Sequence, residues 1–213
     1  MANQKLRGDI SLELAKTISE QANNAFNAGS MFEDVTPTTR DLLNHWFGES
    51  YTDSRTFNFH EGQKQSILNV IYLHEVLKIK DVLDIYSKVD SDLIPFVNLA
   101  DLKKEKYSYP KYAIKMATGT GKTWVMHALM IWQLLNAKHE DSYSGRYTKN
   151  FLVVAPGIIV YDRLLDAFKG KIKEGTQERD EKTNDFYSNG DLFLPEAYKE
   201  EIIRFIQNNT VTK

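Results

Sequence analysis

The sequence predicts an α/β protein in which helices flank a parallel sheet, preceded by a helical N-terminal extension. Two short apolar runs, 112–116 and 151–154, have the composition of buried strands, and a run with the character of a buried helix follows each. Buried strands that alternate with helices along a chain are typical of a parallel sheet covered on both faces. Only two such strands are evident, so we expect the sheet to be incomplete.

Two amphipathic helices are predicted ahead of the sheet. Residues 10–28 place apolar side chains at helical spacing, and Gly29 is a natural stop for that helix. The next helix has Thr36 as its cap and Pro37 at its first position, and it ends at Gly48. Neither helix carries recognisable chemistry, which indicates an accessory layer.

The chain is therefore divided into two predicted parts. Residues 1–57 form the helical extension, and residues 58–213 form the domain that contains the sheet. A long helix over 61–77 opens this domain. The less regular stretch near 79–110 is expected to loop out as an insertion before the first strand. Further helices are predicted after the second strand, and the last of them begins at Pro195.

The turn between the first strand and its helix carries the clearest chemistry. It reads Ala-Thr-Gly-Thr-Gly-Lys-Thr over residues 117–123. A strand, a glycine-containing turn that ends in Gly-Lys-Thr, and a helix together make the phosphate-binding P-loop in its required context. The general pattern has glycine at the position that Met116 occupies here. A turn that merely joins a strand to a helix is the ordinary alternative, which the two flanking elements disfavour.

Each part of this turn has a physical role in binding a nucleotide. Gly119 and Gly121 lack a Cβ, so the backbone can adopt positive φ angles and surround the phosphates with successive N–H groups. The Lys122 ammonium would contact the β- and γ-phosphates, and the Thr123 hydroxyl would be a ligand of Mg²⁺, which prefers hard oxygen donors. Lys122 and Thr123 are thus the predicted catalytic residues. The predicted phosphate-binding residues are Met116, Ala117, Thr118, Gly119, Thr120, Gly121, Lys122 and Thr123.

Gln63 lies upstream, at the start of the long helix, in the sequence Phe-His-Glu-Gly-Gln. Its amide offers a donor and an acceptor, which suit the donor–acceptor edge of adenine, and Phe57 or Phe59 could pack on the base. ATP with Mg²⁺ is therefore the predicted cofactor. An exposed glutamine at a helix start, without a ligand, is the ordinary alternative for this residue taken alone.

A third segment of interest is the abrupt end of the second strand at Pro156 and Gly157. In open α/β sheets, ligands bind at the carboxyl ends of the strands. Gly157 could let a phosphate approach the backbone, and Arg163 could pair with one. An ordinary strand exit packed on a helix explains this segment equally well on its own.

Composition excludes several classes of protein. The 213 residues include 27 basic and 29 acidic side chains, a formal net charge of −2, so nucleic-acid affinity would have to come from a local groove. The absence of cysteine excludes disulfides, thiolate metal sites and a cysteine nucleophile. No signal peptide and no apolar stretch of membrane-spanning length are evident, so we expect a cytoplasmic protein without a membrane partner.

In order and spacing, the three segments resemble the Q motif, motif I and motif Ia of superfamily 2 helicases. Residues 115–123 and the run F-L-V-V-A-P-G-I-I-V-Y-D-R-L-L over 151–165 are similar to the Res subunit of type III restriction enzymes. The Phe-His-x-Gly-Gln opening and Asp-Leu-Phe-Leu-Pro over 191–195 also resemble that family. Met116 in place of glycine is usual in this group. The resemblance covers about residues 36–208.

The resemblance implies a RecA-like fold and a motor that couples ATP hydrolysis to movement along DNA. By this resemblance Gln63 would read adenine, and the P-loop residues would hold the phosphates and Mg²⁺. Pro156, Gly157 and Arg163 would lie near the backbone of double-stranded DNA, which this chain would bind weakly. The implied protein partner is a modification methyltransferase subunit that recognises the DNA sequence, and the family's full-length protein also carries an endonuclease domain.

Some parts of such a motor are not evident in the sequence. No apolar strand ending in Asp-Glu follows Gly157, and neither a second RecA-like domain nor a nuclease motif is found. We therefore expect the N-terminal piece of a longer motor. The alternatives are a type I restriction motor subunit or another superfamily 2 helicase, and, in another class, a stand-alone nucleotide-binding or interaction module. A small-molecule kinase is disfavoured, because no acceptor-site signature or arginine-rich lid is found.

Overall fold

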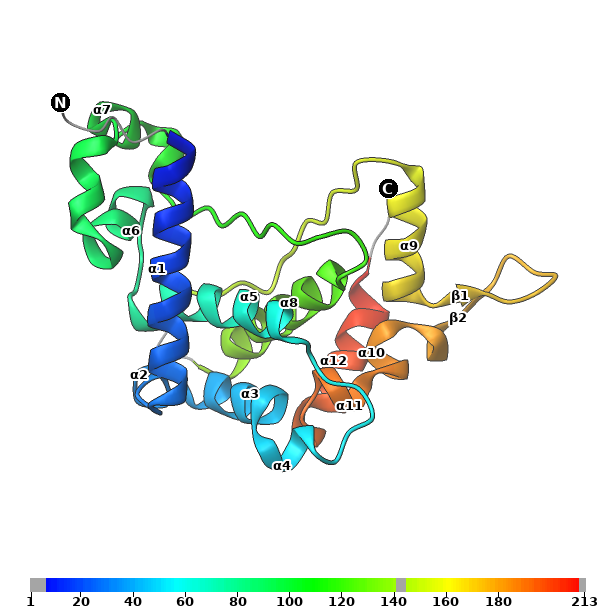
Figure 1. The fold of residues 1–213 in the computed structure, drawn as a ribbon. Coiled ribbons are helices and arrows are strands. Elements are labelled where there is room, and N and C mark those ends of the chain that lie inside the picture. The colour runs from blue at the N-terminus through cyan, green and yellow to red at the C-terminus, as the bar shows by residue number, and fades with distance from the viewer. Residues whose placement is uncertain (1–6, 141–144, 211–213) are drawn as a thin grey trace. The chain divides into compact units, whose positions relative to one another are not determined.

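The computed structural model describes residues 7–140 and 145–210, and these residues are mostly helical (Figure 1). They form two compact units, each built from two separate stretches of the chain. The N-terminal part of the chain is therefore divided between the two units. The first unit comprises Met1–Thr36 and His60–Val125, and the second comprises Pro37–Phe59 and Met126–Lys213.

The first unit contains the long helix α1, which packs along α5, and a series of short helices. The helices predicted over 10–28 and 61–77 are both confirmed, the second with a π-helical turn at its end. The elements are α1 (Arg7–Asn27), α2 (Met31–Asp34), α5 (Glu61–Ile71), the π-helical turn Tyr72–Val76, α6 (Val82–Val89), α7 (Leu99–Leu102) and the 3₁₀ turns Ser91–Phe96 and Glu105–Tyr107.

Polar side chains join α1 to α5. Asn23 Nδ2 donates to Gln65 Oε1 at 2.5 Å, and Asn69 Nδ2 donates to Ser19 Oγ at 3.0 Å. Gln65 Nε2 in turn donates to Asn69 Oδ1 at 2.7 Å. Because these bonds lie on successive turns of both helices, they fix α5 against rotation about its own axis.

An apolar core lies beyond the end of α5. The buried side chains of Leu73, Ile79, Ile85 and Val89 form it. The partly buried side chains packed against it come from α1, from the end of the π-helical turn and from the segment before the P-loop, and they are Leu14, Ile18, Leu77 and Tyr112.

The second unit is also helical, and α8 continues into it from the first unit. The helix that the sequence predicts from Pro37 is confirmed, because α3 begins at this residue. The elements are α3 (Pro37–Phe47), α4 (Glu49–Thr52), α8 (Lys122–His139), α9 (Ile158–Lys169), the 3₁₀ turn Glu181–Thr183, α10 (Asp185–Ser188), α11 (Gly190–Phe193) and α12 (Glu196–Asn209).

Aromatic side chains dominate the core of this unit. Trp46, Trp132, Phe186 and Phe193 are among its largest fully buried residues. Trp46 Nε1 donates to the Phe193 carbonyl at 3.0 Å, and Trp132 Nε1 donates to Thr39 Oγ1 at 3.0 Å. Both indole N–H groups are therefore paired, which removes most of the cost of burying them.

Arg55 links two helix ends in the second unit. Its guanidinium has five N–H donors. The acceptors are five backbone carbonyls: Nε donates to Tyr51 (3.1 Å), Nη2 to His45 (2.8 Å) and Trp46 (3.2 Å), and Nη1 to Asp191 (3.3 Å) and Leu192 (3.2 Å). Carbonyls in the last turn of α3 and in α11, which lack helical partners there, are thereby satisfied.

The described residues contain one sheet, a small antiparallel hairpin. Strands β1 (Lys171–Ile172) and β2 (Arg179–Asp180) pair with Lys171 opposite Asp180, and their connecting loop projects beyond the end of α9 (Figure 1). Gly170, before β1, has a φ of 83°, and a Cβ at this position would overlap the Asp180 carbonyl oxygen. Glycine is therefore required where α9 turns into the hairpin.

The structure does not show the predicted parallel sheet in the described residues. The two predicted strands, 112–116 and 151–154, have no strand assignment. Leu152 and Val154, which we expect in a buried strand, are 89% and 77% exposed. A strand of a parallel sheet exists only through the N–H and C=O groups of its neighbours, and an apolar run cannot specify those neighbours by itself.

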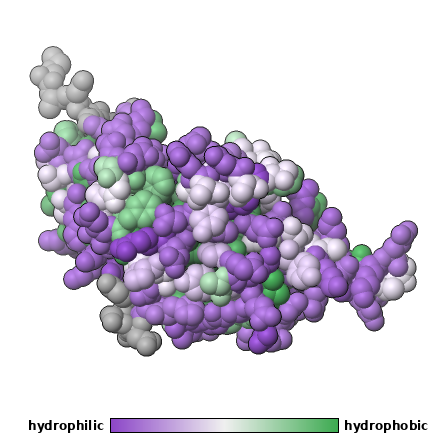
Figure 2. Space-filling model, turned by 90° about the horizontal axis from the view of Figure 1, so that it is seen from below, coloured by the Kyte–Doolittle hydropathy of each residue, from purple (hydrophilic) through white to green (hydrophobic). Residues whose placement is uncertain are grey.

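The surface of the described residues is predominantly polar. The face shown in Figure 2 is mainly hydrophilic, and apolar side chains occupy separate small areas of it. Within the part of the chain that the structure describes, no helix combines the length and the apolar character that a membrane span requires.

Candidate nucleotide-binding site

The P-loop turn lies in the first unit, immediately before α8. Gly119 has a φ of 81° and Gly121 a φ of 69°, a region that side chains with a Cβ rarely adopt. The Gly121 carbonyl accepts from the Trp124 N–H at 3.0 Å and so begins the hydrogen bonding of α8. The turn therefore delivers the chain to a helix N-terminus, where free N–H groups and the helix dipole favour an anion.

The Ala117 carbonyl organises the inside of this turn. It accepts from Thr120 Oγ1 at 2.7 Å and from Lys122 Nζ at 2.7 Å. The Lys122 ammonium thus lies against the turn that its own residue closes. Thr123 is the second residue of α8 and is partly buried. Ammonium, hydroxyl and free N–H groups of this turn are the donor set that a nucleotide phosphate with Mg²⁺ requires.

The start of α5 is capped by His60. Its Nδ1 atom accepts from the Gly62 N–H at 3.1 Å and from the Gln63 N–H at 3.4 Å. In return, Gln63 Oε1 accepts from the His60 N–H at 3.0 Å. This reciprocal arrangement is a capping box, in which a histidine takes the place of the usual serine or threonine.

The same two side chains contact the P-loop. His60 Nε2 lies 2.9 Å from the Thr120 carbonyl oxygen, and Gln63 Nε2 donates to the Gly121 carbonyl at 3.2 Å. Gln63 is only 2% exposed, so the alternative of a solvated surface glutamine is wrong. Its amide nevertheless retains one N–H and one lone pair beyond the bonds to His60 and Gly121.

His60 is a residue of this site to which the sequence assigns no role. Histidine is not a preferred N-cap residue, and its contact partner Thr120 is 60 positions away. The spacing His-x-x-Gln before an apolar helix was the available signal, since it matches the capping-box spacing with an unusual first residue.

The residues of the third segment lie in the second unit. Pro156 and Gly157 directly precede α9, and Arg163 lies within this helix. All three are exposed. Gly157 is the N-cap residue, and its φ of −175° is extended backbone that any residue adopts. Its conformation therefore does not require glycine.

Comparison with protein families identifies a match over most of the chain. The model of the family described as type III restriction enzyme, res subunit, matches residues 56–212. The chain belongs to this family. The res-subunit resemblance drawn from the sequence is thereby confirmed, and the matched region includes the capped start of α5, the P-loop and α9. Comparison with curated proteins and with solved structures found no significant match.

Membership of the res-subunit family supports a helicase-like, ATP-binding role for this chain. It also implies a P-loop fold, whose turn and following helix the structure contains. Among the described residues, no group of three or more His, Cys, Asp or Glu side chains is placed to hold a metal ion.

Proposed function

We propose that the chain binds ATP–Mg²⁺ at its P-loop and serves the motor of a type III restriction enzyme. The observation that carries this proposal is the turn from Ala117 to Lys122, with two glycines at positive φ and the lysine ammonium held against the turn. This arrangement places positive charge and backbone N–H groups close together, as phosphoryl transfer demands of a protein.

The roles of the individual side chains follow from their chemistry. Lys122 would neutralise the charge that develops on the transferred phosphoryl group, and the Thr123 hydroxyl would hold Mg²⁺. We also propose that residues 58–213 form the ATP-binding domain of the motor and residues 1–57 its helical extension. The family match over 56–212 supports this division.

The proposed macromolecular partners are double-stranded DNA and a modification subunit. Pro156, Gly157 and Arg163 are the candidate contacts to the DNA backbone, and their exposure around the start of α9 supports this role. The net charge of −2 means that such binding must be local and sensitive to salt. A cytoplasmic location suits both partners.

Replacement of Lys122 by alanine is expected to weaken ATP binding about ten- to a hundredfold, because a charge-assisted hydrogen bond contributes roughly 1.5–3 kcal/mol. Titration calorimetry with ATP and Mg²⁺ measures the change. Lys115→Ala is the matched control, since Lys115 is an exposed lysine just before the turn. Equal ATP affinity of Lys122→Ala and the unmodified protein would remove the P-loop assignment.

We propose that Gln63 reads adenine through the amide N–H and lone pair that its protein contacts leave available. Gln63→Ala is then expected to weaken ATP binding more than GTP binding, because guanine offers a different edge. Competition of ATP and GTP against a fluorescent ATP analogue gives both affinities. Glu61→Gln is the control, since Glu61 is an exposed residue in the same first turn of α5. An equal loss of affinity for ATP and GTP would show that Gln63 affects binding only through its contact with the P-loop and does not read the base.

A further inference from the structure

We propose that His60 is a positioning residue for the nucleotide site, which fixes the orientation of the P-loop backbone while it caps α5. This inference rests on the proposed function, because the site that is positioned is the proposed ATP site. His60 lies in the Phe-His-x-Gly-Gln segment, in which the sequence assigns a chemical role to Gln63 and none to His60. Its side chain joins the start of α5 to the P-loop.

The hydrogen bonds of His60 define its tautomer. Nδ1 accepts from two backbone N–H groups, those of Gly62 and Gln63, so it carries no proton. The proton of the neutral ring is therefore on Nε2, which donates it to the Thr120 carbonyl oxygen at 2.9 Å. Only the neutral ring with its proton on Nε2 makes both sets of bonds at once.

The bond to Thr120 has a consequence on the other side of the peptide. A trans peptide is planar, with its C=O and N–H groups pointing in opposite directions. When His60 binds the Thr120 carbonyl, the Gly121 N–H is turned away from α5. Gln63 does the same to the next peptide, since it binds the Gly121 carbonyl and turns away the Lys122 N–H. Two successive N–H groups on one side are the start of an anion-binding nest.

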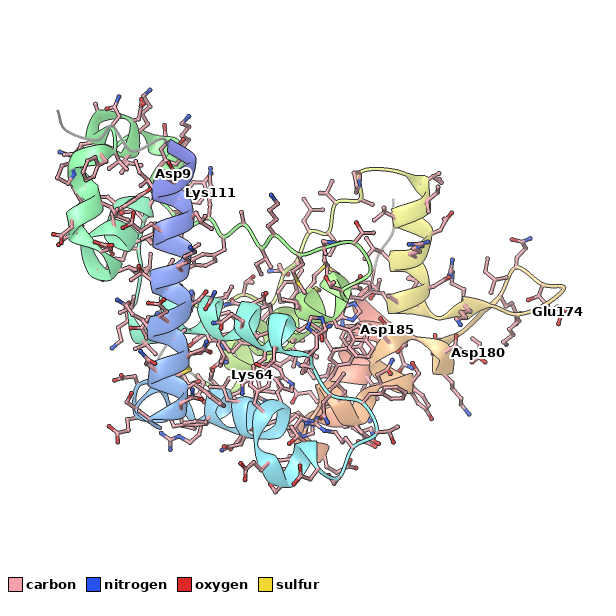
Figure 3. The ribbon with its side chains drawn as sticks, viewed as in Figure 1. Asp9, Lys64, Lys111, Glu174, Asp180 and Asp185 are labelled. Carbon is pink, nitrogen blue, oxygen red and sulfur yellow. The ribbon has the colours of Figure 1, made fainter. Side chains whose placement is uncertain are left out.

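The helix that carries His60 and Gln63, α5, is itself held in place by α1. The bonds of Gln65 and Asn69 to α1 hold α5, and Lys64 lies over the Phe26 ring of α1 with its ammonium 4.7 Å from the ring centroid (Figure 3, where Lys64 is labelled). His60 is exposed, so its replacement creates no cavity in the core. The position can therefore be changed with little effect on folding, provided that the cap is preserved.

His60→Asn separates the two roles of the residue. Asparagine is among the best N-cap residues, so the cap of α5 is kept, but its side chain is too short to reach the Thr120 carbonyl. We expect the denaturant unfolding midpoint to stay close to that of the unmodified protein, while ATP affinity falls about three- to tenfold, as for the loss of a single hydrogen bond. His60→Ala, which also removes the cap, should lower both.

Comparison with Lys122→Ala distinguishes the possible failures. If Lys122→Ala binds ATP as tightly as the unmodified protein, the proposed function itself is wrong. If Lys122→Ala loses binding but His60→Asn retains full affinity, the nucleotide site stands and the positioning role of His60 is overturned. Full retention of ATP affinity in His60→Ala would overturn it in the same way.

A second measurement reads the tautomer of His60 directly in the unmodified protein. Nitrogen-15 spectra of the five histidines report which ring nitrogen carries the proton, and the signals absent from His60→Asn or His60→Ala identify His60. We expect the tautomer protonated at Nε2 in the unmodified protein at neutral pH. The tautomer protonated at Nδ1 would be incompatible with the bonds to Gly62 and Gln63 and would refute the proposal.

Discussion

Acidification from pH 7 to pH 4.5 is expected to remove about 4 to 5 kcal/mol from the free energy of unfolding. The cause is a pair of buried histidines in the second unit. Burial lowers the pKa of His127 from 6.5 to about 3, and burial together with the nearby Arg55 charge lowers the pKa of His45 from 6.5 to about 4. Each pKa unit corresponds to about 1.4 kcal/mol, so two units for each of two histidines reach this magnitude.

The sign of the effect follows from proton binding. Below pH 6.5 the unfolded chain binds a proton at each histidine, whereas the folded chain does not until the pH approaches the lowered values. The free energy of unfolding is therefore at its full value above about pH 6.5. It falls progressively as the pH falls towards 4 for His45 and 3 for His127. The loss should be steepest between these limits.

The surroundings of His127 show why its charged form is disfavoured. Its ring lies among Phe168, Phe186 and Phe193, at centroid distances of 5.1, 4.4 and 5.6 Å. Neither ring nitrogen has a hydrogen-bond partner. The nearest carboxylate is Asp185, labelled in Figure 3, 3.6 Å from Nδ1, and burial raises the pKa of this group. Asp185 therefore gives His127 less compensation than a solvated carboxylate would.

Urea unfolding followed by circular dichroism, at several pH values between 7.5 and 4.5, measures the effect. His127→Phe replaces the ring with an apolar one and should abolish about half of the pH dependence. His139→Gln is the control, because His139 is exposed and paired with Glu201 at the surface. A free energy of unfolding that is constant from pH 6.5 to 4.5 would contradict the prediction.

Gly121→Ala is expected to reduce ATP affinity by more than tenfold. Two costs combine at this position. The φ of 69° disfavours any residue with a Cβ by about 1–2 kcal/mol, and the new Cβ would overlap Gln63 Nε2. Either the Gly121 backbone or the Gln63 amide must move, and both movements disturb the N–H groups that face a phosphate.

Gly119→Ala provides a matched control for this prediction. Gly119 has a similar φ of 81°, but a Cβ there would meet nothing within 4 Å. The Gly119→Ala variant should therefore show only the loss of ATP affinity that comes from the strained backbone. The double variant Gly121→Ala, Gln63→Ala removes the overlap, so its loss of affinity should be smaller than the sum of the two single losses. Equal losses for Gly119→Ala and Gly121→Ala would show that the contact with Gln63 is unimportant.

The parts of the structure that the sequence predicted well are those determined over a few residues. The positive φ angles of Gly119 and Gly121 follow from a turn that must approach an anion, and the start of α3 follows from Pro37. The role of Gln63 was predicted only towards adenine, because its partner Gly121 is 58 positions away. A contact of this kind leaves no periodic trace in the sequence.

The predicted parallel sheet is not seen in the described residues for a related reason. The apolar run 151–154 has the composition of a buried strand, yet burial is a property of the neighbours that cover it, and the run is solvent-exposed for most of its length. The division of the structure into interleaved units was equally hidden. No composition change at Pro37 or Phe59 indicates that this segment groups with residues beyond Val125.

The five carbonyls gathered by Arg55 impose an order of assembly on the second unit. Three of them belong to His45, Trp46 and Tyr51, which leave the ribosome early, whereas Asp191 and Leu192 are made about 140 residues later. Before these residues are made, the guanidinium has three of its five acceptors, and the indole of Trp46 lacks the Phe193 carbonyl as its acceptor. The segment from Pro37 to Phe59 therefore gains its last partners only once residue 193 has been made, and its aromatic side chains stay accessible to chaperones and proteases until then.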